Sequence, residues 1–181
     1  MESITFHNSL KNIGYCGFFY CDKLKSISFP SSLITIGRYA FYHCTLLETV
    51  TFSGSSLKSI GQSAFDSCSS LSSIIIPESI TEIGSFAFRS CSNLNNFQIL
   101  NPNIKDIGAG MLCNLDGLIY SLPTSLQGSK WANYLTDVYG ESFEIPDDMK
   151  NLIDYACAEL SHLKSITIPN SVENIGDHQS R

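Results

Sequence analysis

The stretch "LITIGRYAFYHCTLL" (33–47) sets the pattern of the whole chain, which repeats it as "ITEIGSFAFRSCSNL" (80–94). The two stretches share Ile, Gly, Ala, Phe, Cys and Leu at equivalent positions. Ile-Gly pairs begin at 13, 36, 60, 83 and 107, so these successive copies lie 23 or 24 residues apart, and a sixth pair stands at 175–176. A fixed period of this length indicates an array of stacked structural repeats.

Each repeat combines two patterns with different periods. The segment "LKSISFP" (24–30) alternates apolar and hydroxyl side chains before a closing proline, which predicts a short strand with one buried face. In the second part, Ala40, Cys44 and Leu47 have the spacing of one face of a short helix. The glycine that follows each repeat Ile predicts either a positive φ or a close approach of two backbones.

A single unit of this kind cannot bury its apolar face, but stacked units can. The sequence therefore predicts one β-rich solenoid array over 1–181, with a parallel sheet on the concave side and short helical turns on the other. We expect about eight coils of 22–24 residues. Residues 1–117 form five regular repeats, 118–139 a divergent repeat, and 140–181 a regular repeat followed by a truncated one.

Composition and charge narrow the classes of function. The 181 residues are 43% hydrophobic and 15% charged, and the net charge is −6. Residues 1–105 hold 7 Lys/Arg and 6 Asp/Glu, whereas residues 106–181 hold 4 and 11, so the second half is the acidic one. A negative chain is poorly suited to nucleic acid, and no such partner is expected. With no secretory signal after Met1 and no apolar run that could cross a bilayer, we expect no membrane insertion and, on this basis alone, a cytoplasmic location.

Residues with catalytic or metal-binding chemistry form no recognisable motif. Cysteines 21, 44, 68 and 91 each follow a repeat Ile by eight residues. Such a ladder is either a metal or redox device or a column of small buried residues, and the second is favoured because Leu115 and Leu160 replace Cys in later repeats. The four histidines fall in different slots, and the acidic residues of 137–159 lack the spacing of a calcium loop. We therefore expect no enzyme activity, no cofactor and no metal.

The outward face of the predicted strands is the candidate binding surface. Its residues are mostly hydroxyl and amide side chains: Ser26, Ser28, Thr49, Thr51, Ser73, Ile75, Asn96 and Gln98. Short polar side chains can hydrogen-bond a partner at low entropic cost, but Ser and Thr also suit any solvated strand. Trp131 lies in the divergent repeat, where it either forms a binding bulge or fills space left by lost core residues.

The segment "LKSISFPSSLITIGRYAFYHCTL" (24–46) resembles the BspA-like leucine-rich repeats, a bacterial and protist class typified by treponemal and Bacteroides surface proteins. The resemblance is strong in 1–117 and 140–176 and weak in 118–139. It implies a leucine-rich repeat solenoid without enzyme activity, located at the cell surface or secreted. It also implies a protein or glycan partner, often in adhesion.

Two other interpretations stay open. The absent signal segment favours an intracellular scaffold that uses the same strand face. The chain begins in phase with the repeat and ends in "GDHQSR" (176–181), where another turn is due, which favours a fragment of a larger surface protein. Neither end has the pattern of the polar cap that a solenoid needs, so end-to-end self-association is also expected.

Overall fold

The computed structural model describes residues 2–54, 56–104, 106–115, 119–121, 123, 134, 145–152 and 166–176. These residues contain thirteen short strands. Sheet A consists of β1 (Ser3–Thr5), β3 (Ser26–Phe29), β5 (Thr49–Phe52), β7 (Ser73–Ile76), β9 (Asn96–Ile99) and β11 (Ile119–Ser121). Sheet B consists of β2 (Asn12–Ile13), β4 (Thr35–Ile36), β6 (Ser59–Ile60), β8 (Glu82–Ile83) and β10 (Asp106–Ile107). A third, two-stranded sheet pairs β12 (Asn151–Leu152) with β13 (Asn174–Ile175).

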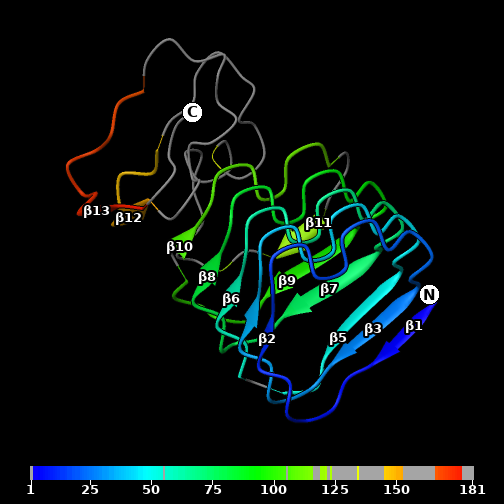
Figure 1. Cartoon of the computed structure of the whole chain (residues 1–181). Helices are drawn as coiled ribbons and strands as arrows, with labels where there is room; N and C mark the ends of the chain where they lie inside the picture. Colours follow the sequence, from blue (N-terminus) through cyan, green and yellow to red (C-terminus); the bar gives the residue numbers. More distant parts are fainter. Residues whose placement is uncertain are drawn as a thin grey trace.

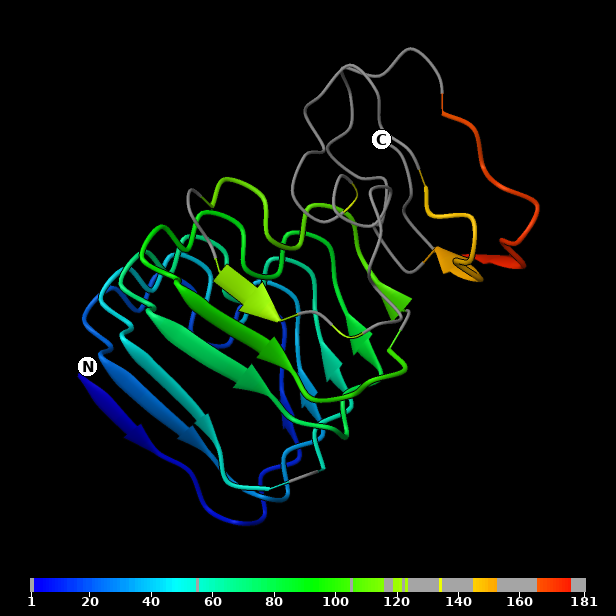
Figure 2. The same cartoon turned by 180° about the vertical axis from the view of Figure 1, so that it is seen from behind.

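Successive coils stack so that each strand pairs in parallel with the equivalent strand one repeat further along the chain. Sheet A has the order β1-β3-β5-β7-β9-β11, and sheet B has the order β10-β8-β6-β4-β2. The two sheets stand on different sides of the same coils in Figure 1, and Figure 2 shows them from behind. The predicted parallel-sheet solenoid is confirmed. Sheet B was not predicted, because each of its strands is only two residues long.

Sheet A forms because its residues alternate between solvent and core. In β3, Ser26 and Ser28 are exposed, and the residue that follows each of them is buried. The register pairs Ser26 with Thr49 and Ile27 with Val50, so equivalent repeat slots lie side by side in neighbouring coils. The polar slots therefore form one outward surface, which we call the strand face.

The repeated glycine marks the closest approach between neighbouring coils. A β-carbon placed on Gly61 would lie 2.6 Å from the Arg38 nitrogen and 2.7 Å from the Gly37 carbonyl carbon. A side chain cannot approach backbone atoms this closely, so only glycine fits there. The close approach is confirmed. The alternative of a positive φ is wrong for this slot, because Gly110 is the one described glycine that has it.

The helix predicted for the second part of each repeat is wrong. Tyr39 and His43 have φ angles of 54° and 59°, which a right-handed helix does not allow. The N–H groups of Tyr39, Phe41 and His43 donate to carbonyl groups of the next coil at 2.9, 2.7 and 2.8 Å. The segment is thus a series of turns that forms a third ladder between coils and satisfies its backbone groups there. The residues chosen by helical spacing are buried all the same.

A column of phenylalanine rings fills the centre of the coils. Phe18, Phe41, Phe65 and Phe88 stack at centroid distances of 5.0, 5.2 and 5.5 Å, with interplanar angles of 9°, 7° and 2°. Phe29 of β3 packs against the edge of this column, 5.6 Å from Phe41. Each coil thereby provides the apolar surface that the next coil covers, so stability depends on contacts between neighbours.

The described residues give six strands in sheet A, so the prediction of about eight coils is slightly too high for this part of the chain. Most of the divergent repeat 118–139 lies outside the described residues, and its assignment stays a prediction. In the ranges that the structure describes, no helix is long and apolar enough to cross a membrane.

Candidate functional site

The strand face presents the predicted binding residues to solvent. Side chains at 26, 28, 49, 51, 75 and 96 are exposed, whereas Ser73 and Gln98 are half-buried. Ile75 is 47% exposed, which is unusual for a large aliphatic side chain in a sheet. Trp131 lies outside the described residues, so its predicted role is not examined by the structure.

The strand face is interrupted between β5 and β7. These strands share a single registered pair, Thr49 with Ser73, whereas β3 pairs with β5 and β7 with β9 over four residues each. The residue after the strand differs as well. Ser53 and Leu100 donate their N–H groups to the preceding coil at 3.0 Å, but Pro77 occupies the equivalent position after β7 and has no N–H group to donate.

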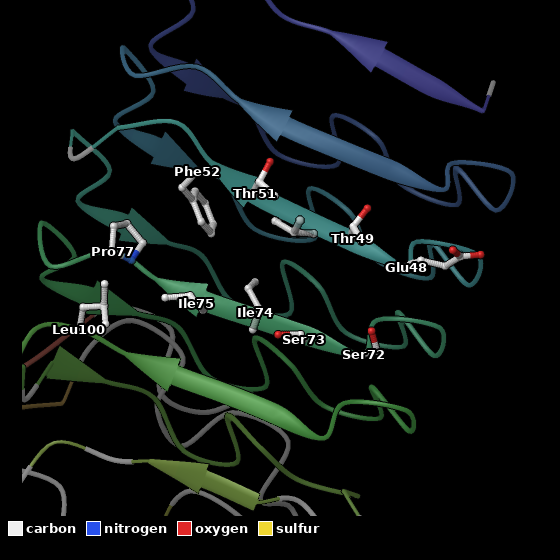
Figure 3. Close-up of a pocket in the computed structure, with 11 residues that line it drawn as sticks. Glu48, Thr49, Thr51, Phe52, Ser72, Ser73, Ile74, Ile75, Pro77 and Leu100 are labelled. Carbon is white, nitrogen blue, oxygen red and sulfur yellow. The ribbon is translucent and has the colours of Figure 1, made fainter.

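A groove of about 440 Å³ lies where β5 and β7 diverge. Figure 3 shows Phe52 and Ile74 together with Ile75, Pro77 and Leu100 around it. Val50 and Ile74 are buried and form its floor, while Leu100, which is 52% exposed, stands at its rim. The remaining lining residues carry hydroxyls or a carboxylate: Glu48, Thr49, Thr51, Ser72 and Ser73. The groove is apolar with a polar edge.

The predicted site residues divide into three groups. Thr49, Thr51, Ser73 and Ile75 all line the groove between β5 and β7. Ser28 lines a second groove of about 370 Å³, which also adjoins a proline, Pro30. Ser26, Asn96 and Gln98 lie on the strand face but line neither groove.

Sequence reasoning missed Pro77 and Leu100 as lining residues. Both stand in the slot that closes a strand, and that slot varies between proline, Ser53 and Leu100 along the array. This variation was the available signal, because proline is the residue that cannot extend a ladder.

The cysteine ladder is a packing device. Cys44, Cys68 and Cys91 are buried and free of disulfides. Each thiol donates to the carbonyl group of a phenylalanine in the preceding coil, at sulfur–oxygen distances of 3.3, 3.2 and 3.1 Å. Burial raises the pKa of the Cys68 and Cys91 thiols, so the neutral donor form is favoured. Among the described residues, no group of three or more His, Cys, Asp or Glu side chains could hold a metal ion.

Comparisons with known proteins agree with the repeat pattern. The family model described as the BspA type leucine rich repeat region matches residues 1–119 and 133–179, with 6 copies. No curated protein matches the sequence.

Solved structures extend the comparison to the fold. A leucine-rich repeat protein from Bacteroides ovatus is 29% identical, with a TM-score of 0.61 over 93% of this chain and 43% of its own. A leucine-rich repeat protein from T. pallidum is 27% identical, with a TM-score of 0.61 over 92% of this chain and 67% of its own. The pneumococcal vaccine antigen PcpA shares the fold at 20% identity, with a TM-score of 0.52 over 93% of this chain and 50% of its own.

This chain thus spans less than half of the Bacteroides ovatus protein and about two thirds of the treponemal one. The family model, the in-phase stacking of the coils and the glycine, phenylalanine and cysteine columns lead to one conclusion: the chain belongs to the BspA-type leucine-rich repeat family.

Proposed function

We propose that this chain is a non-enzymatic interaction protein that binds a partner protein through its strand face. The observation that carries the proposal is the groove between β5 and β7, which collects four of the predicted binding residues around an apolar floor. Its volume of about 440 Å³ is within the range of sites that take small molecules or large side chains.

The lining of the groove favours a protein side chain over a sugar. Val50, Phe52 and Ile74 offer an apolar floor, on which a buried aliphatic or aromatic group gains the most. The hydroxyls of Thr49 and Ser73 stand at the edge, where they can orient the backbone of a partner by hydrogen bonds. A glycan is the other class of partner expected from the family, and the experiment below tests for it separately.

The negative charge at the groove favours a partner segment that carries a basic residue. Glu48 lies at one end of the lining, next to Thr49, and it is exposed (Figure 3). An apolar residue flanked by Lys or Arg therefore fits the groove best. The second groove at Pro30 lies two coils away along the same face, so a longer partner segment can reach both, and the two modest contacts add in avidity.

The test uses a library of random dodecapeptides displayed on phage, selected against the full chain, with a glycan array as the second arm. Two variants are compared with the wild type. Ile75→Ser removes the exposed aliphatic group. Pro77→Ser introduces the residue found after β5, Ser53, and so restores an N–H group that can extend the ladder into the groove. Ile34→Ser is the matched control, because Ile34 is 37% exposed and precedes β4 in sheet B.

We expect peptides with an apolar residue beside a basic one to be selected. Their affinity should fall about tenfold or more in Ile75→Ser and in Pro77→Ser, and stay unchanged in Ile34→Ser, because the fall needs the groove itself. Selection of glycans alone, or equal affinity for wild type and both groove variants, would overturn the proposal. Circular dichroism of each variant establishes that the fold is kept.

The setting of this interaction stays a prediction. Adhesion at a cell surface, an intracellular scaffold and membership of a larger surface protein each use the same strand face. End-to-end self-association also stays a prediction.

A further inference from the structure

A second surface of different chemistry lies on the turn side of the first two coils. Five aromatic side chains gather there and line a hollow of about 560 Å³: Tyr15, Phe19, Tyr20, Tyr39 and Tyr42. We call them the aromatic patch. Tyr15, Phe19 and Tyr20 are 70%, 43% and 52% exposed, so these rings are not part of the core.

The repeat does not require aromatic residues in these slots. One coil further along, the slots of Tyr39 and Tyr42 hold Ser63 and Asp66, and the fold of that coil is the same. Packing therefore does not account for the patch. Exposed rings in this number, in a chain whose core is complete without them, indicate a contact surface.

The arrangement of the rings defines what can bind them. Phe19 stacks on Tyr42 at 5.1 Å and 12°, and Tyr20 stacks on His43 at 4.4 Å and 19°. The faces that these rings turn toward each other are closed to a sugar ring or a nucleobase. The exposed edges and hydroxyls of Tyr15 and Tyr20 are available to a partner, and the positive edge of an aromatic ring favours the face of another ring or an anion.

The charged residues around the aromatic patch also favour an anionic partner. The Arg38 guanidinium lies 5.9 Å from the centre of the Tyr15 ring and 5.3 Å from that of Tyr39, within the range of a cation–π contact. Arg89, which also lines the hollow, is bonded at 2.7 Å to Asp66, whose side chain is 1% exposed. The charge of Asp66 is thus offset by Arg89, and Arg38 adds a second cation beside these rings.

We propose that the aromatic patch is a second docking surface, which binds an acidic peptide segment of a partner protein that presents an aromatic side chain next to Asp or Glu. The partner ring packs against the edges of Tyr15 and Tyr20, and its neighbouring carboxylate pairs with Arg38. Tyrosine and arginine are, with tryptophan, enriched among the residues that dominate the binding energy of protein interfaces. This surface is independent of the strand face, so either proposal can fail without the other.

The experiment measures fluorescence anisotropy of labelled dodecapeptides on the full chain. The parent peptide has the core Glu-Trp-Glu in a Gly-Ser background, and three others carry Gln for Glu, Lys for Glu, or Ala for Trp. A uronic-acid oligosaccharide is added as the anionic competitor without an aromatic ring. The variants are Tyr15→Ser/Tyr20→Ser and Arg38→Gln, and Ile75→Ser on the strand face is the control.

The parent peptide should bind tightest, and loss of its Trp or of both tyrosines should weaken binding about tenfold or more. Arg38→Gln should weaken the Glu peptide but leave the Gln peptide unchanged, which a loss of fold would not do. Raised salt should weaken the parent most. Binding that ignores peptide charge, binding unchanged in the tyrosine variant, competition by the oligosaccharide alone, or no binding at millimolar peptide would each overturn the proposal.

Discussion

Phe41 and Phe88 occupy the same slot of two different coils, and Tyr42 and Arg89 occupy the slot that follows. The first two residues are identical and fully buried in the ring column. The other two differ in size and charge, and both lie around the hollow on the turn side. An inward slot touches a coil on each side and tolerates little change, whereas an outward slot meets solvent. Residues that repeat in every coil therefore serve the packing between coils. Residues that depart from the repeat are where properties particular to this chain are found.

The largest expected effect comes from breaking the inward column. Phe65→Ala should lower the free energy of unfolding by about 3–5 kcal/mol, because Phe65 is fully buried between two stacked rings. Phe19→Ala, at a 43% exposed ring, should change it by less than about 1 kcal/mol. Urea unfolding followed by circular dichroism measures both. Equal losses in the two variants would remove the distinction between inward and outward slots.

A smaller effect is expected where the backbones meet. Gly61→Ala should cost about 1–3 kcal/mol, because its new methyl group would lie 2.6 Å from the Arg38 nitrogen, which is backbone and cannot move aside. Gly14→Ala is the matched control in the same slot, since no atom lies within 4 Å of its added β-carbon. That change should be neutral or slightly stabilising. If both variants lost the same stability, the glycine would be needed for its backbone freedom rather than for the close approach.

The residues whose burial could be predicted from the sequence are those that point into the core. Ile83, Gly84 and Cys91 recur because every coil faces the same neighbour, so their burial and the solenoid itself followed from the spacing. The turns were mistaken for a helix because both put residues four apart on one side. No glycine marked the change, since Tyr39 and His43 hold the positive φ angles.

The candidate sites were less accessible to prediction. The exposed residues of the strand face followed from alternation, but the groove depends on how two coils pair, and one coil alone does not reveal that. Pro77 was visible in the sequence, but the single registered pair between β5 and β7 was not. The aromatic patch does not repeat, so a search for repeats passed over it.

The smallest expected effect concerns pH and the cysteine column. Burial raises the pKa of Cys68 and Cys91 in the folded state above the usual value of 9.0. As pH rises above 9.0, the unfolded chain releases these protons while the folded chain keeps them, so the unfolded state gains stability. The contribution of each thiol is complete below pH 9.0 and falls by about 1 kcal/mol at pH 10.

The measurement is the free energy of unfolding of the wild type and of Cys68→Ala/Cys91→Ala between pH 7 and pH 10. Tyrosine and lysine titrate alike in both proteins, so the difference between the two curves isolates the thiols. We expect the wild type to lose more stability over this interval than the variant. Parallel curves would mean that the cysteine column is open to solvent. The inward slots would then be less buried than the comparison of Phe41 with Tyr42 implies.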